Sequence, residues 1–449
     1  MSAIITDQLR ILNSENFVAG IASTTNSYYA WIGLPNPADF QSDWSENPPS
    51  PKDSFSEEND YWDTMIALKK LNSDDIARVV RKITWSSGTT YEMYRDDYSR
   101  SNLSPQTSST NLYDTNYYVM NSNFRVYVCL QNGTNPENTS GRPSLDEPLF
   151  TDLEPRSAGA SGDGYIWKYL FTIDPNSIIK FDSTSFIPLP QNWSTNNDVA
   201  AVRNNASTSG QLKIVSITNR GVGYGTAATY NNVPINGDGS GGRCSVVVNA
   251  AGKIDSVEIT NGGSNYTFGT VGLSDVGLTN PSGSTDAAFN VIIPPQDGHG
   301  ADVYRELGAN RVLIYSRLEN DPSNPDFITG NQFSRVGLCR DPLAFGSDNK
   351  LELSKASAVY ALKLTGAGST TTTFTADSEV TQEIGIGSTA VGRVINYDAT
   401  TGVLKYWQDR RLAISTDGTA PSYGYQLFRF NADPATGAGT TIFGGTSNL

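Results

Sequence analysis

The chain has 449 residues, more than a single hydrophobic core usually organises, so its length predicts two to four domains. Its net charge is −14, from 46 acidic and 32 basic residues, and no cluster of Lys and Arg forms a basic stripe. This balance argues against a nucleic-acid partner, because affinity for phosphate backbones comes mainly from Lys and Arg. No apolar run approaches the ~20 residues that cross a bilayer, so we also expect no membrane partner.

The composition predicts a mainly β protein. Aromatic residues make up 10% of the chain, and 41 Gly and 22 Pro provide turns between short β-branched runs. The cysteines, Cys129, Cys244 and Cys339, are too few and too widely spaced for a secreted disulfide framework. The first residues, MSAIITDQLR, carry no signal-peptide pattern. We therefore expect a soluble chain made in a reducing cytoplasm.

The N-terminal part predicts a few short helices. Thr6 is placed to cap the first of them. The best helix candidate is 57–71 (EENDYWDTMIALKKL), whose acidic first turn and basic last turn suit the helix dipole. Ser73, with two aspartates after it, predicts another short helix through Val80.

Strands dominate the rest of this part. Candidates are the run from Asn26 to Pro35, 81–85 and 124–130, followed by GDGYIWKYLF at 162–171. That last strand has aromatics at alternate positions: Tyr165, Trp167, Tyr169 and Phe171. Alternate side chains of a strand share one face, so we expect all four rings on one face.

Burial explains this ring face better than ligand binding does. Each ring covers about 150–250 Å² when packed, so the set covers roughly 600–1,000 Å². That exceeds the ~300–600 Å² of the largest exposed apolar patch on a typical monomer. We therefore interpret the four aromatics as a structural motif of a core or a subunit interface, with a ligand platform as the alternative.

Residues 205–293 are rich in Gly, Asn, Ser and Thr and repeat themselves. ITNRGVGY (217–224) aligns with ITNGGSNY (259–266), VPI (233–235) with VGL (276–278), and CSVVV (244–248) with AFNVI (288–292). Two copies are too few for a solenoid, so we expect a small paired β module inserted into a host domain. GDGSGG (237–242) lacks the Lys of a P-loop and the closing Glu of an EF-hand, which favours a turn between repeat strands.

The remaining sequence returns to the host domain and then adds another β domain. Strand candidates are 311–318 and 333–339, and 395–407 predicts a hairpin with its turn between Asp398 and Gly402. The expected fold is a two-layer antiparallel β-sandwich body with a few short helices, an inserted Gly-rich β repeat module and a C-terminal β domain. The expected boundaries are 1–204 with 294–358 for the body, 205–293 for the insert and 359–449 for the last domain.

No group of residues predicts catalysis, a cofactor or a metal site. The only histidine, His299, lies between glycines, and no Cys/His cluster at ligand spacing accompanies it. No G-x-S-x-G elbow is present. Pairs of carboxylates of the kind that glycosidases use arise by chance among 46 acidic residues and carry no signal.

Several segments together resemble one protein family. GDGYIWKYLFTI resembles a signature of the baseplate wedge subunit, the product of gene 8, of T-even-like contractile-tailed phages. Further similar segments occur in the same order: ENFVAGIASTTNSYYAWIGLPNP, YWDTMIALKKL, DIARVVRKITW, FRVYVCLQNG and, as in cyanophage-type relatives, DGHGADVYRELGANRVLI and FSRVGLCRDP. The similarity covers roughly 1–195 and 294–345, so the insert and the last domain lie outside it.

The resemblance implies a non-enzymatic structural protein of the virion, located in the tail baseplate and assembled in the host cytoplasm. Members of that family are mostly antiparallel β proteins that form a homodimer in each wedge and join other baseplate wedge proteins. Tyr165, Trp167 and Tyr169 carry over as scaffold positions only. The insert and the last domain would then contact further wedge proteins, a fibre or the adjacent wedge.

Two other functions stay open at this point. A receptor-binding or polysaccharide-degrading tail spike would act on host sugars, although such spikes usually have many β-helical repeats. A carbohydrate-binding decoration would use Tyr224 and Tyr266 as ring platforms. These tyrosines occupy equivalent repeat positions, and such positions more often close a turn.

Overall fold

The computed structural model describes residues 6–33, 65–208, 211–281, 283–319, 333, 335–344, 348–352, 359–365, 374–376, 378–385, 388–407 and 442–444. The protein is mainly β, with 38% strand and 13% helix in several antiparallel sheets, as the sequence predicts. The chain divides into two compact units, 1–19 with 74–315 and 20–73 with 316–449. These units differ from the expected boundaries, because 20–73 and 316–358 belong with the C-terminal part and not with the body.

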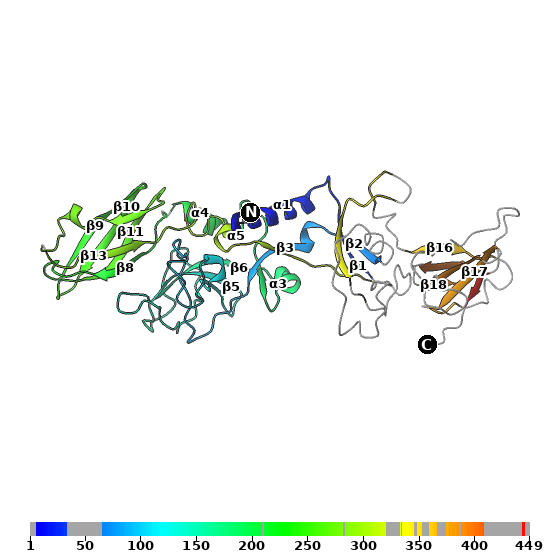
Figure 1. Ribbon diagram of the computed structural model, residues 1–449, viewed down its shortest axis with the longest axis horizontal. Coiled ribbons are helices and arrows are strands. Elements are labelled where there is room, and N and C mark those ends of the chain that lie inside the picture. The colour runs from blue at the N-terminus through cyan, green and yellow to red at the C-terminus, as the bar shows by residue number, and fades with distance from the viewer. Residues whose placement is uncertain are drawn as a thin grey trace. The chain divides into compact units, whose positions relative to one another are not determined.

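The first unit contains a body with two three-stranded sheets (Figure 1). One sheet has the order β14-β3-β7, made of β14 (Arg311–Ile314), β3 (Ile76–Arg81) and β7 (Phe186–Pro188). The other has the order β4-β5-β6, made of β4 (Tyr118–Met120), β5 (Arg125–Asn132) and β6 (Tyr165–Thr172). Side chains of both sheets join one hydrophobic cluster, which is the core of the body.

Short helices surround these sheets. They are α1 (Asp7–Ala22), which begins in this unit, α3 (Pro175–Phe181), α4 (Ala200–Thr208), α5 (Val303–Glu306) and the single turn η3 (Leu112–Asp114). Leu9 donates its backbone N–H to Thr6 Oγ1 at 3.3 Å, so Thr6 caps α1 as predicted. The Ser14 hydroxyl lies 2.7 Å from the carbonyl oxygens of both Ile11 and Ala309, which holds α1 against the segment after α5.

The helix predicted at 57–71 is wrong over the residues that the structure describes. Met65–Lys70 forms β2, which pairs with β1 (Tyr28–Gly33) and places Leu68 opposite Trp31. Residues 57–64 lie outside the described residues. The charge pattern of a helix was present, but pairing with a neighbouring strand outweighs local propensity.

The helix predicted from Ser73 is also wrong beyond its first turn. Ser73–Asp75 forms the single 3₁₀ turn η2, and β3 follows at once. Ile76, Val79 and Val80 are buried in this strand, because β-branched residues suit a strand that has neighbours on both edges. The strand predicted at 81–85 is accordingly displaced, and Thr84 makes only one parallel bridge, to Met120 of the other sheet.

The repeat module of the first unit interleaves its two copies (Figure 1). The strands of the first copy are β8 (Val215–Arg220), β9 (Ala228–Gly237) and β10 (Ser240–Val248). Those of the second are β11 (Ile254–Ser264), β12 (Gly269–Val271) and β13 (Ala287–Val291), with the 3₁₀ turn η4 (Leu273–Val276). Strand β8 pairs with β13, β9 with β12 and β10 with β11, so every strand of one copy has a partner in the other.

The module has its own hydrophobic cluster, built mainly from β-branched side chains of both copies. Equivalent turns shape the two copies: Asn219 Oδ1 accepts the N–H of Gly221 at 2.9 Å, and Asn261 Oδ1 accepts that of Gly263 at 3.0 Å. Both glycines have positive φ, +61° and +57°. The predicted turn is present within 237–242, because Asp238 and Gly239 connect the end of β9 to the start of β10.

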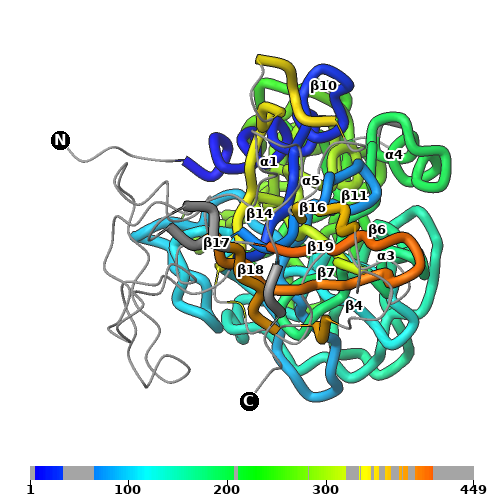
Figure 2. Tube along the Cα trace, turned by 90° about the vertical axis from the view of Figure 1, so that its right-hand side faces the viewer, coloured from blue at the N-terminus to red at the C-terminus, as the bar shows by residue number. Residues whose placement is uncertain are grey.

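The second unit contains two further antiparallel sheets. One has the order β15-β1-β2, with β15 (Arg335–Arg340) near the strand predicted at 333–339. The other has the order β16-β19-β18-β17-β20, made of β16 (Tyr360–Lys363), β19 (Val403–Trp407), β18 (Ser388–Asp398), β17 (Glu379–Gly385) and β20 (Ile442–Gly444). Figure 2 shows β16, β19, β18 and β17 side by side. The predicted hairpin is present, because Asp398 pairs with Val403 and the Gly402 N–H donates to the Asp398 carbonyl at 2.7 Å.

Candidate functional site

The aromatic strand β6 has a bulge that divides its rings between two faces. Tyr169 pairs with Tyr127 of β5, whereas Phe171 pairs with the next residue, Val126, so Leu170 has no partner in the register. Neighbouring residues of a strand point to opposite faces, and paired residues share a face. Tyr165, Trp167 and Tyr169 therefore lie on one face and Phe171 on the other, so the expectation of a single four-ring face is wrong.

Three of these four rings belong to the interior. Tyr165, Trp167 and Phe171 are buried in the body core, and Tyr169 is half-buried against it. The Tyr165 and Trp167 rings stack, with centroids 5.3 Å apart and planes 15° apart. Phe171 and Trp193 pack in a T-shaped arrangement, with ring centroids 6.1 Å apart. These contacts place the rings in the structure of the body and leave no ring ladder open to a ligand at this strand.

The Gly-Asp-Gly before the strand is shaped by close backbone approach. The Asp163 carboxylate accepts the N–H of Leu145 at 2.9 Å and that of Tyr165 at 3.0 Å, which ties two segments together. Gly164 has a φ of +85°, and a Cβ there would lie 2.7 Å from the Cα of Gly133. No other residue type fits this position without a shift of the backbone.

The opposite face of β6 carries a buried lysine. The Lys168 ammonium donates to the Leu153 carbonyl at 2.7 Å and to Asn205 Oδ1 at 3.0 Å. Asn205 in turn donates to Glu154 at 2.8 Å, and Glu154 pairs with Lys213 at 2.9 Å. A polar chain thus runs from the core strand through α4 to the beginning of the repeat module.

Burial affects the pKa values of the charged side chains in this hydrogen-bonded series. It lowers the pKa of Lys168 to about 8, and the charge of Lys213 adds to this effect, while Glu306 and Glu154 oppose it. Burial alone would raise the pKa of Glu154, but the hydrogen bonds from Asn205 and Lys213 outweigh it and lower that pKa. The sequence contained one signal for this lysine: its strand neighbours Ile166 and Leu170 made the second face partly apolar.

His299 is also buried and has a structural partner. Its Nδ1 lies 2.7 Å from Glu306 Oε1, and Glu306 Oε2 accepts the N–H of Gly300 at 2.7 Å. The Tyr94 ring and the imidazole pack in a T-shaped arrangement, with centroids 4.8 Å apart. Burial, and then the charge of Glu306, raises the pKa of Tyr94. The sequence showed only that glycines flank this histidine, and both of these glycines have positive φ.

Glu92 is a second buried carboxylate that sequence reasoning missed. It accepts the backbone N–H groups of Gln106, Thr107 and Asn116 at 2.9–3.1 Å. Like Asp163 and Glu306, it holds separate loops by their amides, and a carboxylate bonded in this way serves the structure of the body.

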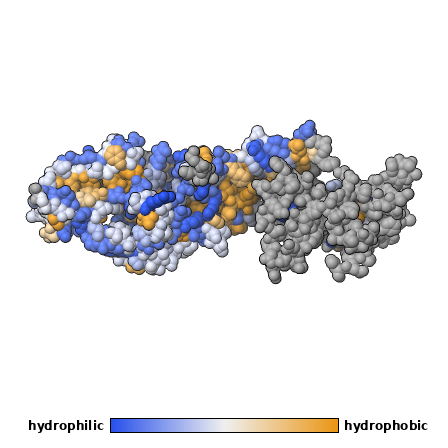
Figure 3. All heavy atoms as spheres, viewed as in Figure 1, coloured by the Kyte–Doolittle hydropathy of each residue, from blue (hydrophilic) through white to orange (hydrophobic). Residues whose placement is uncertain are grey.

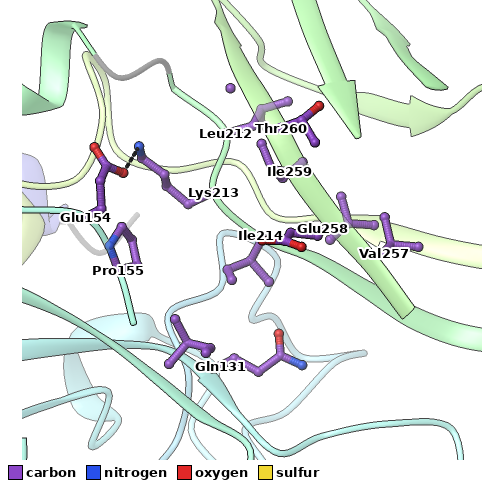
Figure 4. A pocket seen from close by; sticks show the side chains of 13 residues that line it. Gln131, Glu154, Pro155, Leu212, Lys213, Ile214, Val257, Glu258, Ile259 and Thr260 are labelled. Atoms are coloured by element: carbon purple, nitrogen blue, oxygen red, sulfur yellow. Dashed lines mark hydrogen bonds and ion pairs between the residues drawn. The ribbon is translucent and has the colours of Figure 1, made fainter. Parts of the chain in front are cut away.

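A cleft of about 450 Å³ lies where the repeat module meets the body (Figure 4). The module contributes Leu212 to Val215 and Val257 to Thr260 with Gly262, and the body contributes Gln131, Glu154, Pro155 and Ile166. Further along β8, Arg220 pairs with Glu137 of the body through two contacts of 2.8 and 3.2 Å. The same guanidinium donates to the carbonyls of Ile254 and Asp255, which holds β11 near β8.

The two repeat tyrosines are buried in the module. Tyr224 accepts the N–H of Ala287 at 2.8 Å, and Tyr266 accepts that of Gly242 at 3.0 Å. In each case the tyrosine hydroxyl of one copy accepts a hydrogen bond from a backbone N–H near the start of the third strand of the other copy. The tyrosines therefore close the interleaved module, and their rings are not open to sugar.

The comparisons with known proteins identify no family for the chain, since no family model matches it and no curated protein matches its sequence.

The thiols of Cys129, Cys244 and Cys339 are free. The described part of the chain contains no group of three or more His, Cys, Asp or Glu that could hold a metal ion. Among the helices that the structure describes, none has both the length and the hydropathy of a bilayer crossing.

Proposed function

We propose that the chain is a non-enzymatic structural subunit of a phage tail baseplate, a wedge subunit that dimerises and links neighbouring wedge proteins. The observation that supports the proposal is the structural use of the GDGYIWKYLF segment, one of the segments whose shared order carries the family resemblance. Asp163 and Gly164 fix the entry to β6, and Tyr165 and Trp167 form the centre of the body core. Residues used in this way suit a scaffold and not a binding groove.

The surface supports association with other polypeptides. Figure 3 shows apolar residues gathered on the visible face of the repeat module. Phe268 of the module is an exposed side chain. In the second unit, Val336 and Leu338 are exposed on β15, the terminal strand of its sheet among the described residues. Exposed apolar side chains on a terminal strand favour pairing with another chain.

Sedimentation of the purified chain at micromolar concentration tests the proposal first. We expect a dimer, and a chain that stays monomeric would count against a wedge subunit. Labelling of intact particles with an antibody to this chain should then mark the baseplate body. A label at fibre tips would instead support the receptor-binding alternative.

Incubation with host-surface polysaccharide separates the scaffold from a polysaccharide-degrading spike. We expect no release of oligosaccharide. Release that disappears when a single carboxylate is replaced by its amide would overturn the proposal. The carbohydrate-binding alternative has lost its stated platforms, because Tyr224 and Tyr266 are buried.

A further inference from the structure

The cleft between the body and the module has a mainly polar lining that also includes aliphatic side chains. Ile166 of β6 and Pro155 line it from the body, and Ile214 and Val257 line it from the module. Its volume of about 450 Å³ lies within the range of roughly 300–1,000 Å³ that is typical of ligand sites. The aliphatic side chains fit methylene groups, and the polar part of the lining fits a ligand that also carries hydrogen-bonding groups.

The charged groups of the cleft are distributed unequally (Figure 4). Glu154 and Lys213 neutralise each other on one side, at 2.9 Å. Gln131 and Glu258 lie on the other side, and no described residue forms a hydrogen bond or ion pair with the Glu258 side chain. Gln131 donates its Nε2 to the Thr134 carbonyl at 3.4 Å, which leaves its amide oxygen as an acceptor. This side of the cleft therefore offers a carboxylate and an amide oxygen as acceptors.

From these features we infer that the cleft receives a basic side chain, preferably arginine, presented by a partner polypeptide. The methylene stem lies along Ile166 and Ile214, and the guanidinium donates to the Glu258 carboxylate and the Gln131 amide oxygen. Arginine fits better than lysine, because its planar group donates to two acceptors at once. The net charge of −14 further favours a basic partner.

The polypeptide source rests on the proposed scaffold function, whereas the preference for an amphipathic cation rests on the cleft alone. A failure of either can be recognised separately. The scaffold is tested by sedimentation and particle labelling, and the cleft by direct binding of small probes to the full chain.

The binding test uses N-butylguanidinium and its neutral counterpart N-butylurea. The full chain carries ¹³C-labelled isoleucine methyl groups, and the signals of Ile166, Ile214 and Ile259 report on the cleft. We expect saturable shifts of these signals with N-butylguanidinium, and binding of N-butylurea at least about tenfold weaker, because a charged hydrogen bond is lost. Equal binding of both probes, no saturable shift, or equal shifts of the core residues Ile173 and Ile187 would overturn the inference.

Matched variants locate the cation. Glu258→Gln should weaken N-butylguanidinium binding about tenfold and leave N-butylurea unchanged. Asp286→Asn makes the same chemical change at an exposed carboxylate beside the far end of β8, where Ala287 pairs with Arg220, and should change nothing. An effect of Asp286→Asn equal to that of Glu258→Gln would show a general charge effect and refute the site.

A third probe tests the polypeptide source. The acetylated and amidated peptide Ala-Ala-Arg-Ala-Ala should shift the same methyl signals and bind at least as tightly as N-butylguanidinium. Exclusion of the peptide, with the small cation still bound, would mean that the cleft admits only free small molecules and would overturn the inference.

Discussion

The body and the repeat module of the first unit bury their strands by different means. The body relies on large rings and buried charged groups, such as Trp193 against Phe171 and Glu92 against Thr107. The module relies on small β-branched side chains and on one turn geometry that is used twice. The body therefore depends on individual side chains, and the module on the agreement between its two copies.

The largest effect should come from the centre of the body. Trp167→Ala should lower the free energy of unfolding by about 3–5 kcal/mol, because a buried ring is replaced by a cavity. Trp167→Phe should cost only about 1–2 kcal/mol, since Nε1 has no hydrogen-bond partner among the described residues. Urea unfolding, followed by hydrogen exchange of the β5 and β6 peptides, measures both.

Tyr169→Ala is the control on the same strand and the same face. Its ring is only half-buried, so its cost should be clearly smaller than that of Trp167→Ala. Equal costs would mean that ring burial does not explain the stability of the body.

The next largest loss of stability should be the same in both copies of the module. Gly221→Ala and Gly263→Ala each force a side chain into positive φ and bring Cβ to within 2.6 and 2.5 Å of backbone nitrogens. Each should cost roughly 2–4 kcal/mol, from backbone strain and from crowding. Hydrogen exchange of β8 to β13 measures the loss.

Gly283→Ala separates the two causes. Gly283 has a φ of +87°, but a Cβ added there would meet no atom within 4 Å, so only the strain of about 1–2 kcal/mol should appear. Clearly unequal costs at Gly221 and Gly263 would show that the two copies are not equivalent.

The smallest effect concerns the pH dependence of the body. The pKa of Lys168 is lowered from 10.5 to about 8 in the folded chain, so the folded state releases this proton before the unfolded state does. The cost of burying the charge is therefore present below pH 8 and is relieved as the pH rises toward 10.5. Between about pH 8 and pH 9.5, the chain should gain roughly 1–2 kcal/mol relative to Lys168→Met.

Urea unfolding at several pH values gives this difference. The range stops at about pH 9.5 because tyrosines ionise in the unfolded chain above it. Parallel pH profiles for the two proteins would contradict the lowered pKa of Lys168.

Local patterns allowed part of the fold to be predicted. The Asp398–Gly402 turn, the Thr6 cap and the two repeat copies were all visible as short-range signals. The helix predicted at 57–71 failed over 65–70, because the pairing partner of that segment, β1, is remote in sequence. The candidate cleft was not predicted, because its walls come from five separate stretches of the chain.

Short-range patterns were sufficient for the mainly β character, the duplicated module and the aromatic strand, since period-two alternation, turn residues and repeats are all local. Three features emerged only from the folded chain: a bulge at Leu170 turns Phe171 to the other face, Lys168 is buried, and the two copies interleave. One physical reason is common to all three. Register, burial and strand partners are set by contacts between segments that lie far apart in the chain, and no local pattern records them.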